Sequence, residues 1–354
     1  MNHNKAFIIV VVLLSASVSG YELYQRYNAE EEPRFQWPDK VDIPCNPDST
    51  EFDCEVYAQV SSTPVKSLQH PTNNEIWIAA LNGIIASWDG TTMTEIGNLS
   101  DVISNCHNEQ GLLGFEFTHD FSSSQEILLS YTENADCEGG SNLSGMVIAS
   151  VEVVDNKINM NSLVELRTIA KENRNHNGGN LHSLNDGTYL WSLGDGGGSS
   201  DPYGNGQNVH NPLGTIQYFS YGDKMIEPVF DNYGNDTDYV LHHGLRNPWK
   251  FDTDNQGRLW IADVGQYCFE EVNVVPMLTQ SNFGWSEREG MHIYDPSDDC
   301  SSPPDALTDS SLTDPIIEYP HVGGNCSITG GFWMDWGPNS CLLYTSDAAD
   351  DQLG

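Results

Sequence analysis

The stretch D-G-T-Y-L-W-S-L-G-D-G-G, residues 186–197, joins a turn to a short β-rich apolar run with a small or acidic end. Three other stretches have the same form: N-N-E-I-W-I-A-A-L-N-G-I-I at 73–85, Q-E-I-L-L-S-Y-T-E-N at 125–134 and Q-G-R-L-W-I-A-D-V-G at 256–265. Their centres are roughly 50 to 70 residues apart, which suits one four-stranded propeller blade per unit. Long amphipathic helical periodicity is missing, and this disfavours a parallel α/β fold. The sequence therefore predicts an all-β propeller.

The composition indicates a folded, acidic protein. The 354 residues suffice for one large domain or two ordinary ones. There are 51 acidic and 14 basic side chains, and the formal net charge is -37. Such a charge excludes nucleic acid and anionic membrane surfaces as partners. The 9 tryptophans and 15 tyrosines distinguish the chain from an intrinsically disordered acidic one.

The N-terminus has the pattern of a secretory signal peptide over residues 1–20. Lys5 precedes an apolar run of about ten residues, and small residues, Val18 and Gly20, follow it. The run is short for a bilayer span, although a permanent anchor is the alternative. We therefore expect a secreted, extracellular protein, which would be periplasmic in a bacterium.

The cysteines agree with export. Those before residue 341 are Cys45, Cys54, Cys106, Cys137, Cys268, Cys300 and Cys326, and no two form a C-x-x-C pair. In an exported protein this scatter favours disulfides over a metal cluster. We expect residues 21–60 to form a polar lead-in closed by Cys45 and Cys54. N-x-S/T sequons for glycosylation start at Asn98, Asn142, Asn235 and Asn325.

A histidine among short amides and glycines is the first candidate for chemistry. His176 lies in N-R-N-H-N-G-G-N-L-H, residues 173–182, and Asp195 lies at the end of the next strand. One hairpin-sized excursion separates the two side chains, so they can meet at the same end of a blade. A carboxylate beside an imidazole fixes its tautomer and raises its basicity, as a general base requires. A glycine-rich turn with a merely structural histidine is the alternative.

Two later stretches suggest anion and cation binding. Arg246 and Asn247, in H-H-G-L-R-N-P-W-K-F at 242–251, suit a clamp for an anionic or carbonyl group, or else Arg246 neutralises neighbouring acids. A-D-V-G-Q-Y-C-F-E-E-V-N at 262–273 brings together carboxylates and carbonyls, which are the hard oxygens that calcium prefers. D-T-D-N-Q-G at 252–257 begins like a helix-loop-helix calcium site but runs directly into a strand, so a hairpin turn is predicted.

Together these stretches resemble the glucose/sorbosone dehydrogenase family. The motifs, in the family's order, are N-E-Q-G-L-L-G-F-E-F-T-H-D-F at 108–121, N-H-N-G-G-N-L at 175–181, L-G-D-G-G at 193–197, G-L-R-N-P-W at 244–249, A-D-V-G-Q with E-E-V-N, N-F-G-W at 282–285 and C-S-I-T-G-G-F at 326–332. The resemblance extends from about residue 62 to 335. The family contains soluble PQQ-dependent aldose dehydrogenases and the propeller domain of hedgehog-interacting-like proteins.

The resemblance implies a six-bladed β-propeller that holds the quinone PQQ in its central mouth. His176 matches the base that takes the proton of the sugar C1 hydroxyl while hydride passes to the quinone, and Asp195 matches its orienting carboxylate. Arg246 and Asn247 match a pair that contacts the quinone. The amides of the His176 loop, Asn175 among them, are expected to hydrogen-bond it.

The resemblance also implies two calcium sites, and the chain differs from the family at one cofactor-binding position. Gly265 and Gln266 match backbone carbonyls on the calcium that polarises the cofactor, and Glu271 matches a ligand of a second, structural calcium. At a cofactor-binding position where bacterial members carry glutamine, this chain has Glu109, and an ionised carboxylate there would repel a tricarboxylate quinone.

Two functions follow from the sequence. The first is an exported PQQ- and calcium-dependent aldose dehydrogenase that oxidises a small sugar and passes electrons to an external acceptor. The second is a non-enzymatic extracellular binding propeller of the hedgehog-interacting-like type, which Glu109, the expected disulfides and the sequons favour.

The C-terminal residues 341–354 are expected to be non-native. The stretch C-L-L-Y-T-S-D-A-A-D at 341–350 resembles a translated sequencing adapter. We expect the propeller to occupy residues 61–340 and to be truncated before its last blade is complete. The four units and a predicted strand at 327–336 give at most five blades, so residues 21–340 alone should aggregate and be inactive because unpaired blade edges stay open.

Overall fold

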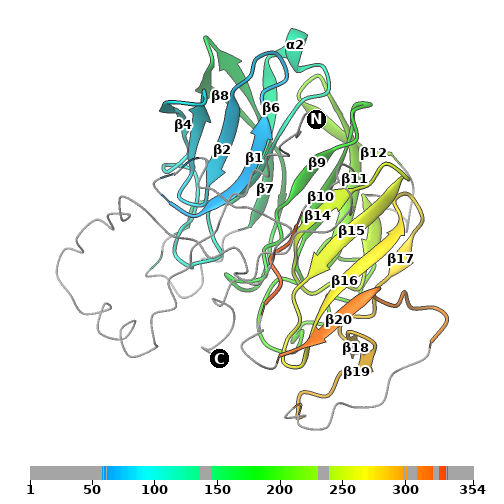
Figure 1. Cartoon of the computed structure of the whole chain (residues 1–354). Coiled ribbons are helices and arrows are strands. Elements are labelled where there is room, and N and C mark those ends of the chain that lie inside the picture. Colours follow the sequence, from blue (N-terminus) through cyan, green and yellow to red (C-terminus); the bar gives the residue numbers. More distant parts are fainter. Residues whose placement is uncertain are drawn as a thin grey trace, which may run out of the picture.

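The computed structural model describes residues 62–135, 145–229, 239–297, 309–321 and 327–331, together with residues 58, 60, 137, 300 and 333. Over these residues the chain is built almost entirely from antiparallel strands, with one short helix, α2 (Phe121–Ser124). Figure 1 shows the sheets following one another in chain order, from blue to yellow. The predicted all-β fold is confirmed.

Four of the sheets are propeller blades, each made from consecutive stretches of chain. Blade 1 has the strand order β1 (Pro64–Gln69), β2 (Ile76–Ala80), β3 (Ile84–Trp88), β4 (Met93–Asn98). Blade 2 has the order β5 (Leu112–Phe117), β6 (Glu126–Thr132), β7 (Met146–Val154), β8 (Lys157–Ile169). Neighbouring strands within both blades pair antiparallel.

The other two blades use strands that lie further apart in the chain. Blade 3 contains β9 (Leu181–Ser183), β10 (Thr188–Leu193), β11 (Thr215–Gly222) and β13 (Val240–His243), extended by β12 (Met225–Pro228) and by β17 (Ser281–Asn282), which pairs parallel with β13. Blade 4 has the order β14 (Pro248–Thr253), β15 (Arg258–Asp263), β16 (Phe269–Pro276), β20 (Ile317–Pro320). A separate hairpin joins β18 (Arg288–Glu289) to β19 (His292–Ile293).

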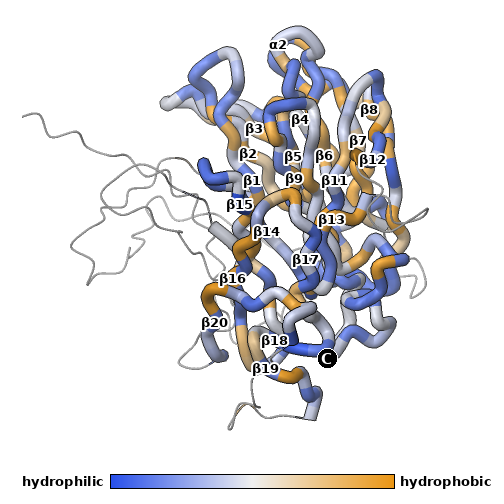
Figure 2. The backbone as a smooth tube through the Cα atoms, turned by 90° about the vertical axis from the view of Figure 1, so that its right-hand side faces the viewer, coloured by the Kyte–Doolittle hydropathy of each residue, from blue (hydrophilic) through white to orange (hydrophobic). Residues whose placement is uncertain are grey.

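The recurring unit of the sequence forms the second strand of each blade. The four apolar runs are β2, β6, β10 and β15. These runs are apolar on both faces because each blade is covered by its neighbours, and the buried clusters accordingly combine residues of blades 1 and 2, of blades 2 and 3, and of blades 3 and 4. In Figure 2 hydrophobic residues follow the strands, whereas many connecting loops are hydrophilic.

Trp191 shows how one blade is joined to the next. Its ring, on β10, is buried, and its Nε1–H donates to Ser130 Oγ on β6 of blade 2 at 2.8 Å. A buried aromatic ring removes 150–250 Å² from water, which at 25 cal/mol per Å² is worth roughly 4 to 6 kcal/mol before the entropy cost. The hydrogen bond satisfies the one polar group of the ring, so Trp191 itself is buried between blades 2 and 3 with its donor paired.

Two disulfides bear out the interpretation of the cysteines. Cys106 is bonded to Cys137, and Cys268 to Cys300. Cys45, Cys54 and Cys326 lie outside the described residues, as do the predicted signal peptide and lead-in. Among the described residues, no helix is long and apolar enough to cross a membrane.

The hairpin predicted at 252–257 is confirmed. It joins β14 to β15, and Asp254 organises the turn by accepting hydrogen bonds from Gln256 N, Arg258 N and Trp260 Nε1, each at 2.9 Å. These three donors leave Asp254 occupied by its own turn, so it is not a metal ligand of the helix-loop-helix type.

The strand predicted at 327–336 is wrong for the residues described, 327–331 and 333, which have no regular secondary structure. Two of their backbone donors bind carboxylates of blade 4 rather than a neighbouring strand: Ile328 N reaches Glu270 Oε2 at 2.9 Å, and Trp333 N reaches Asp252 Oδ2 at 2.8 Å. The described part of the segment therefore packs along blade 4. The count of six blades and the truncation stay predictions.

Candidate functional site

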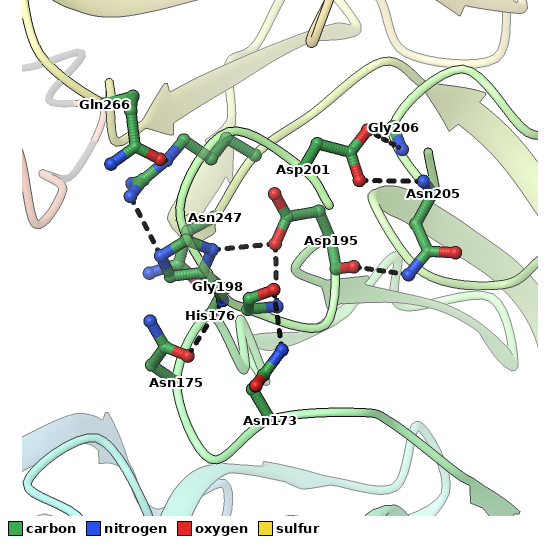
Figure 3. Close-up of polar contacts among 12 residues, drawn as sticks. Asn173, Asn175, His176, Asp195, Gly198, Asp201, Asn205, Gly206, Asn247 and Gln266 are labelled. Carbon is green, nitrogen blue, oxygen red and sulfur yellow. Dashed lines mark hydrogen bonds and ion pairs between the residues drawn. The ribbon is translucent and has the colours of Figure 1, made fainter. Parts of the chain in front are cut away.

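The residues singled out in the sequence gather where blades 1 to 4 present loops at one common end. Glu109 precedes β5, His176 lies between β8 and β9, Asp195 follows β10, and Arg246 lies between β13 and β14. Gln266 follows β15. Figure 3 shows the side chains of His176, Asp195 and Gln266 converging from these loops. The prediction that His176 and Asp195 meet is confirmed.

The imidazole of His176 is held at both nitrogens. Its Nδ1 lies 2.7 Å from Asp195 Oδ1, and its Nε2 lies 2.9 Å from Arg246 Nη2 (Figure 3). A guanidinium can only donate, so Nε2 must be the acceptor, and Nδ1 therefore carries the hydrogen that Asp195 accepts. The neutral tautomer fixed in this way keeps its lone pair on Nε2. A lone pair presented by a fully buried imidazole is what a general base needs.

Asp195 is surrounded by donors. Besides His176, its Oδ1 accepts Gly197 N at 2.9 Å, and its Oδ2 accepts Trp285 Nε1 at 2.9 Å. Burial alone would raise the pKa of this carboxyl, but His176, Arg246 and the Gly197 N–H together hold the pKa below its ordinary value. Asp195 is therefore the ionised partner of the pair.

Arg246 is buried and fastened to the blade 4 side of the site. Its Nε donates to Gln266 Oε1 at 3.2 Å, and its Nη1 donates to Val264 O at 3.1 Å. Its backbone N and that of Asn247 both donate to the Asp263 carboxylate, at 2.9 and 2.7 Å. Burial raises the pKa of Asp263 to about 7, although these N–H groups and Arg246 pull it down. Asp263 thus fixes the backbone from which the guanidinium extends.

The amides near His176 serve loop backbone. Asn247 Oδ1 accepts Gly178 N at 3.0 Å, and Asn175 Oδ1 accepts Gly198 N at 3.2 Å. Gln266 Oε1 also accepts Ser200 N at 3.1 Å. These contacts tie the loops of blades 2, 3 and 4 to one another and so keep the site rigid.

The predicted metal ligands are divided between two places. Gly265 and Gln266 lie beside Arg246, whereas Glu271 is on β16, in register with Asp263 of β15. Within the described part of the chain, no group of three His, Cys, Asp or Glu side chains is placed to hold a metal ion.

Three residues of this site were not singled out in the sequence. They are Lys171, Asp263 and Trp285. Asp263 and Trp285 lie inside two motifs given above, A-D-V-G-Q and N-F-G-W. The sequence signal for them was an acid or an indole close to a glycine in such a motif. Lys171 lies in a polar run, K-E-N-R-N, and gave no signal at all.

We expect Gly194→Ala to destabilise the site. A Cβ at Gly194 would lie 2.2 Å from His176 O, and backbone at that distance must move. The free energy of unfolding should fall by about 1–3 kcal/mol, the usual cost of overpacking, measured by chemical denaturation. The matched control is Gly222→Ala, where an added Cβ meets no atom within 4 Å. Equal stability of the two variants would show that the His176 loop does not depend on this close approach.

Comparison with known proteins assigns the chain. The profile of the family described as "Glucose / Sorbosone dehydrogenase" matches residues 62–337. The HIPL2 protein of Arabidopsis thaliana is 30% identical over an alignment of 197 residues, which covers 49% of this chain and 28% of that protein. The HIPL1 protein of the same plant is 30% identical over an alignment of 193 residues, which covers 47% of this chain and 27% of that protein. The chain thus spans less than a third of the length of these two relatives.

Solved structures agree with the propeller. The PQQ-bound aldose sugar dehydrogenase of Streptomyces coelicolor has a TM-score of 0.61 and 21% identity, covering 78% of this chain and 73% of that chain. The apo-form of the soluble aldose sugar dehydrogenase of Escherichia coli has a TM-score of 0.58 and 19% identity, covering 73% of this chain and 72% of that chain. At these identities the likeness establishes the fold. Because the family profile covers most of the sequence and the propeller is the fold of its solved relatives, the chain belongs to the glucose/sorbosone dehydrogenase family.

Proposed function

We propose that the protein is an exported PQQ- and calcium-dependent aldose dehydrogenase that oxidises the C1 hydroxyl of a sugar and passes the electrons to an external acceptor. The observation that carries this proposal is the His176 imidazole, whose tautomer is locked at both nitrogens so that Nε2 is a buried acceptor. The family and the PQQ-bound relative support the choice of reaction. Six-bladed closure is part of the same proposal.

The side chains present fit the quinone. PQQ is a tricarboxylate, and it needs cationic and amide donors around a mouth that excludes water. Arg246 supplies the cation, and Asn175 and Asn247 lie beside His176 as amides. The Glu109 carboxylate accepts His176 N at 2.7 Å, so it contacts the protein itself. Arg246, Asn175 and Asn247 are the residues we assign to the cofactor.

An orphaned oxygen supports a cation near Glu271. Asn273 is fully buried, its Nδ2 donates to Glu271 Oε1 at 2.7 Å, and among the described residues its Oδ1 has no hydrogen-bond partner. Burial and the neighbouring Asp263 raise the pKa of Glu271 well above its ordinary value. Calcium takes carboxylate and amide oxygens together and would satisfy all of them. We assign Glu271 to this structural site, and the Gly265 and Gln266 carbonyls to a calcium beside the cofactor.

The residues of the chain would divide the chemistry as follows. When bound, PQQ would be the oxidant and would accept a hydride. A sugar hydroxyl that donates to His176 Nε2 takes the place now filled by Arg246 Nη2, and Nε2 holds the proton when the C1–H bond breaks. Asp195 stabilises the imidazolium through Nδ1–H. The aldose has then lost a hydride and a proton and become a lactone.

A non-enzymatic binding propeller of the hedgehog-interacting-like type is the second candidate. The relatives from Arabidopsis thaliana favour it, because they are the more similar in sequence, at 30% identity. Its distinguishing feature is that it has no need for the cofactor.

Titration with PQQ separates the two candidates. We expect the natural full-length protein, with calcium present, to bind PQQ saturably. Arg246→Met should weaken binding about 10- to 100-fold, the effect of losing hydrogen bonds to a charged group. Arg258→Met, which alters a hairpin turn on blade 4, is the matched control and should bind as the unmodified protein does. No binding at micromolar PQQ would favour the second candidate.

A further inference from the structure

The peptide group that leads into His176 is held at both ends by buried charged side chains. Its carbonyl, Asn175 O, accepts Lys171 Nζ at 2.7 Å, and its N–H, His176 N, donates to Glu109 Oε2 at 2.7 Å. The cation and the anion therefore lie on opposite sides of one peptide bond and polarise it in the same direction.

Asn177 ties the same two residues together a second time, through the Lys171 side chain and the Glu109 backbone. Its Oδ1 accepts a hydrogen bond from Lys171 Nζ, and its Nδ2 donates to Glu109 O at 3.0 Å. Lys171 lies just after β8 of blade 2, and Glu109 lies between blades 1 and 2. The His176 loop is thus fastened to two separate parts of the scaffold.

The backbone at His176 needs such fastening. Its φ is 51°, in the left-handed region that a non-glycine residue avoids by roughly 1–2 kcal/mol. The two glycines that follow, Gly178 and Gly179, also have positive φ, at 62° and 95°, so the loop has little intrinsic preference for this path. Hydrogen bonds from outside the loop must therefore fix the direction in which the imidazole leaves the backbone.

The charges of Lys171 and Glu109 compensate each other in the protein interior. Lys171 is 4% exposed and Glu109 is 9% exposed. Burial lowers the pKa of Lys171 to about 7, while Glu109, Asp195 and Glu172 pull it upward. Removing one partner would leave the other as an uncompensated buried charge, whereas removing both would not.

We propose that Glu109 and Lys171 are positioning residues: they clamp the Asn175–His176 peptide between opposite charges and so aim the His176 imidazole. This assigns Glu109 to the protein scaffold rather than to contact with the cofactor. It also gives Lys171, which has no role in the proposed reaction, a reason to be buried beside it. The kinetic part of the inference rests on the proposed function, and the structural part does not.

The test compares Glu109→Gln, Lys171→Met and the double variant in the full-length protein. The primary measurement is amide hydrogen exchange at His176 without cofactor. Lys171→Met should speed this exchange about 10- to 100-fold, because two hydrogen bonds are lost and a carboxylate is left uncompensated. The double variant should exchange more slowly than Lys171→Met alone, because glutamine keeps an acceptor for the N–H and no lone charge remains.

An exposed ion pair provides the control, and steady-state kinetics provide a second measurement. Glu152→Gln and Lys224→Met make the same substitutions in a surface ion pair at 2.7 Å, and they should leave His176 exchange unchanged. In the loaded protein, Lys171→Met should lower kcat about 10- to 100-fold with KM and PQQ affinity within about threefold, as misaimed catalytic groups do.

Two results would overturn the clamp. One is unchanged His176 exchange in both single variants. The other is a change in PQQ affinity on Glu109→Gln that persists when Lys171 is also replaced, since that would place Glu109 on the cofactor. If Lys171→Met does not fold, Glu109→Gln decides the matter by the same exchange measurement. An absence of turnover would count against the proposed function alone, because exchange is measured without it.

Discussion

Replacing His176 by alanine is expected to lower aldose oxidation by a factor on the order of 10² to 10⁴, the usual contribution of a general base. The reason is the loss of the Nε2 lone pair, which lies on that nitrogen because Asp195 and Arg246 fix the tautomer from both sides. The fold of the loop should survive, because its backbone is held by side chains other than the imidazole. Steady-state dye reduction at saturating aldose measures the effect.

His210→Ala is the matched control for this substitution. His210 is exposed, and its backbone N–H donates to Asn208 Oδ1 at 3.1 Å. It should retain the rate of the unmodified protein, and PQQ affinity should change little in either variant. A His176→Ala protein that turns over as fast as His210→Ala would remove His176 from the role of base.

Asp195→Asn is expected to lower turnover by a factor on the order of 10² to 10⁴, as loss of the orienting carboxylate does in comparable histidine pairs. The Asp195 carboxylate has three hydrogen-bond partners, and all are donors: His176 Nδ1–H, the Gly197 backbone N–H and Trp285 Nε1–H. An amide has one oxygen, so in either orientation its NH₂ group must face a donor.

The two orientations fail for different reasons. With NH₂ toward His176, the imidazole must move its hydrogen to Nε2, where it meets the Arg246 donor and can no longer accept a proton. With NH₂ toward Trp285, the tautomer survives but the charge that stabilises the imidazolium is gone. Asp186→Asn, in an exposed turn, is the matched control. Equal rates for the two variants would show that the carboxylate at 195 does not support the base.

Much of the fold was predictable because it depends on local pattern. The strands β2, β6, β10 and β15 are buried on both faces, so each one is a short and nearly continuous apolar run that can be recognised in the sequence. The segment at 327–331 was not predictable in the same way. Its β-branched pair Ile328-Thr329 suits a strand, but the Ile328 N–H donates to Glu270, a carboxylate of blade 4 that lies 58 residues away in the chain.

In the candidate site, too, contacts between residues near in sequence were predictable, and contacts between distant residues were not. His176 and Asp195 are 19 residues apart, on either side of the β9–β10 hairpin, so their pairing follows from that hairpin. The contact between Arg246 and His176 spans 70 residues and the strands of blade 3 from β9 to β13, and only the assembled propeller produces it. Lys171 looks like a solvated charge in the sequence, and it becomes buried because the chain turns inward after β8 ends at Ile169.

Oxidation of a sugar by the reconstituted protein tests the central claim most directly. The natural full-length protein would be loaded with PQQ and calcium, and the reduction of an artificial dye would be followed with a broad panel of aldoses. The account predicts dye reduction that requires aldose, PQQ and calcium together and that is lost in His176→Ala. Tight PQQ binding without dye reduction by any aldose of the panel would contradict it.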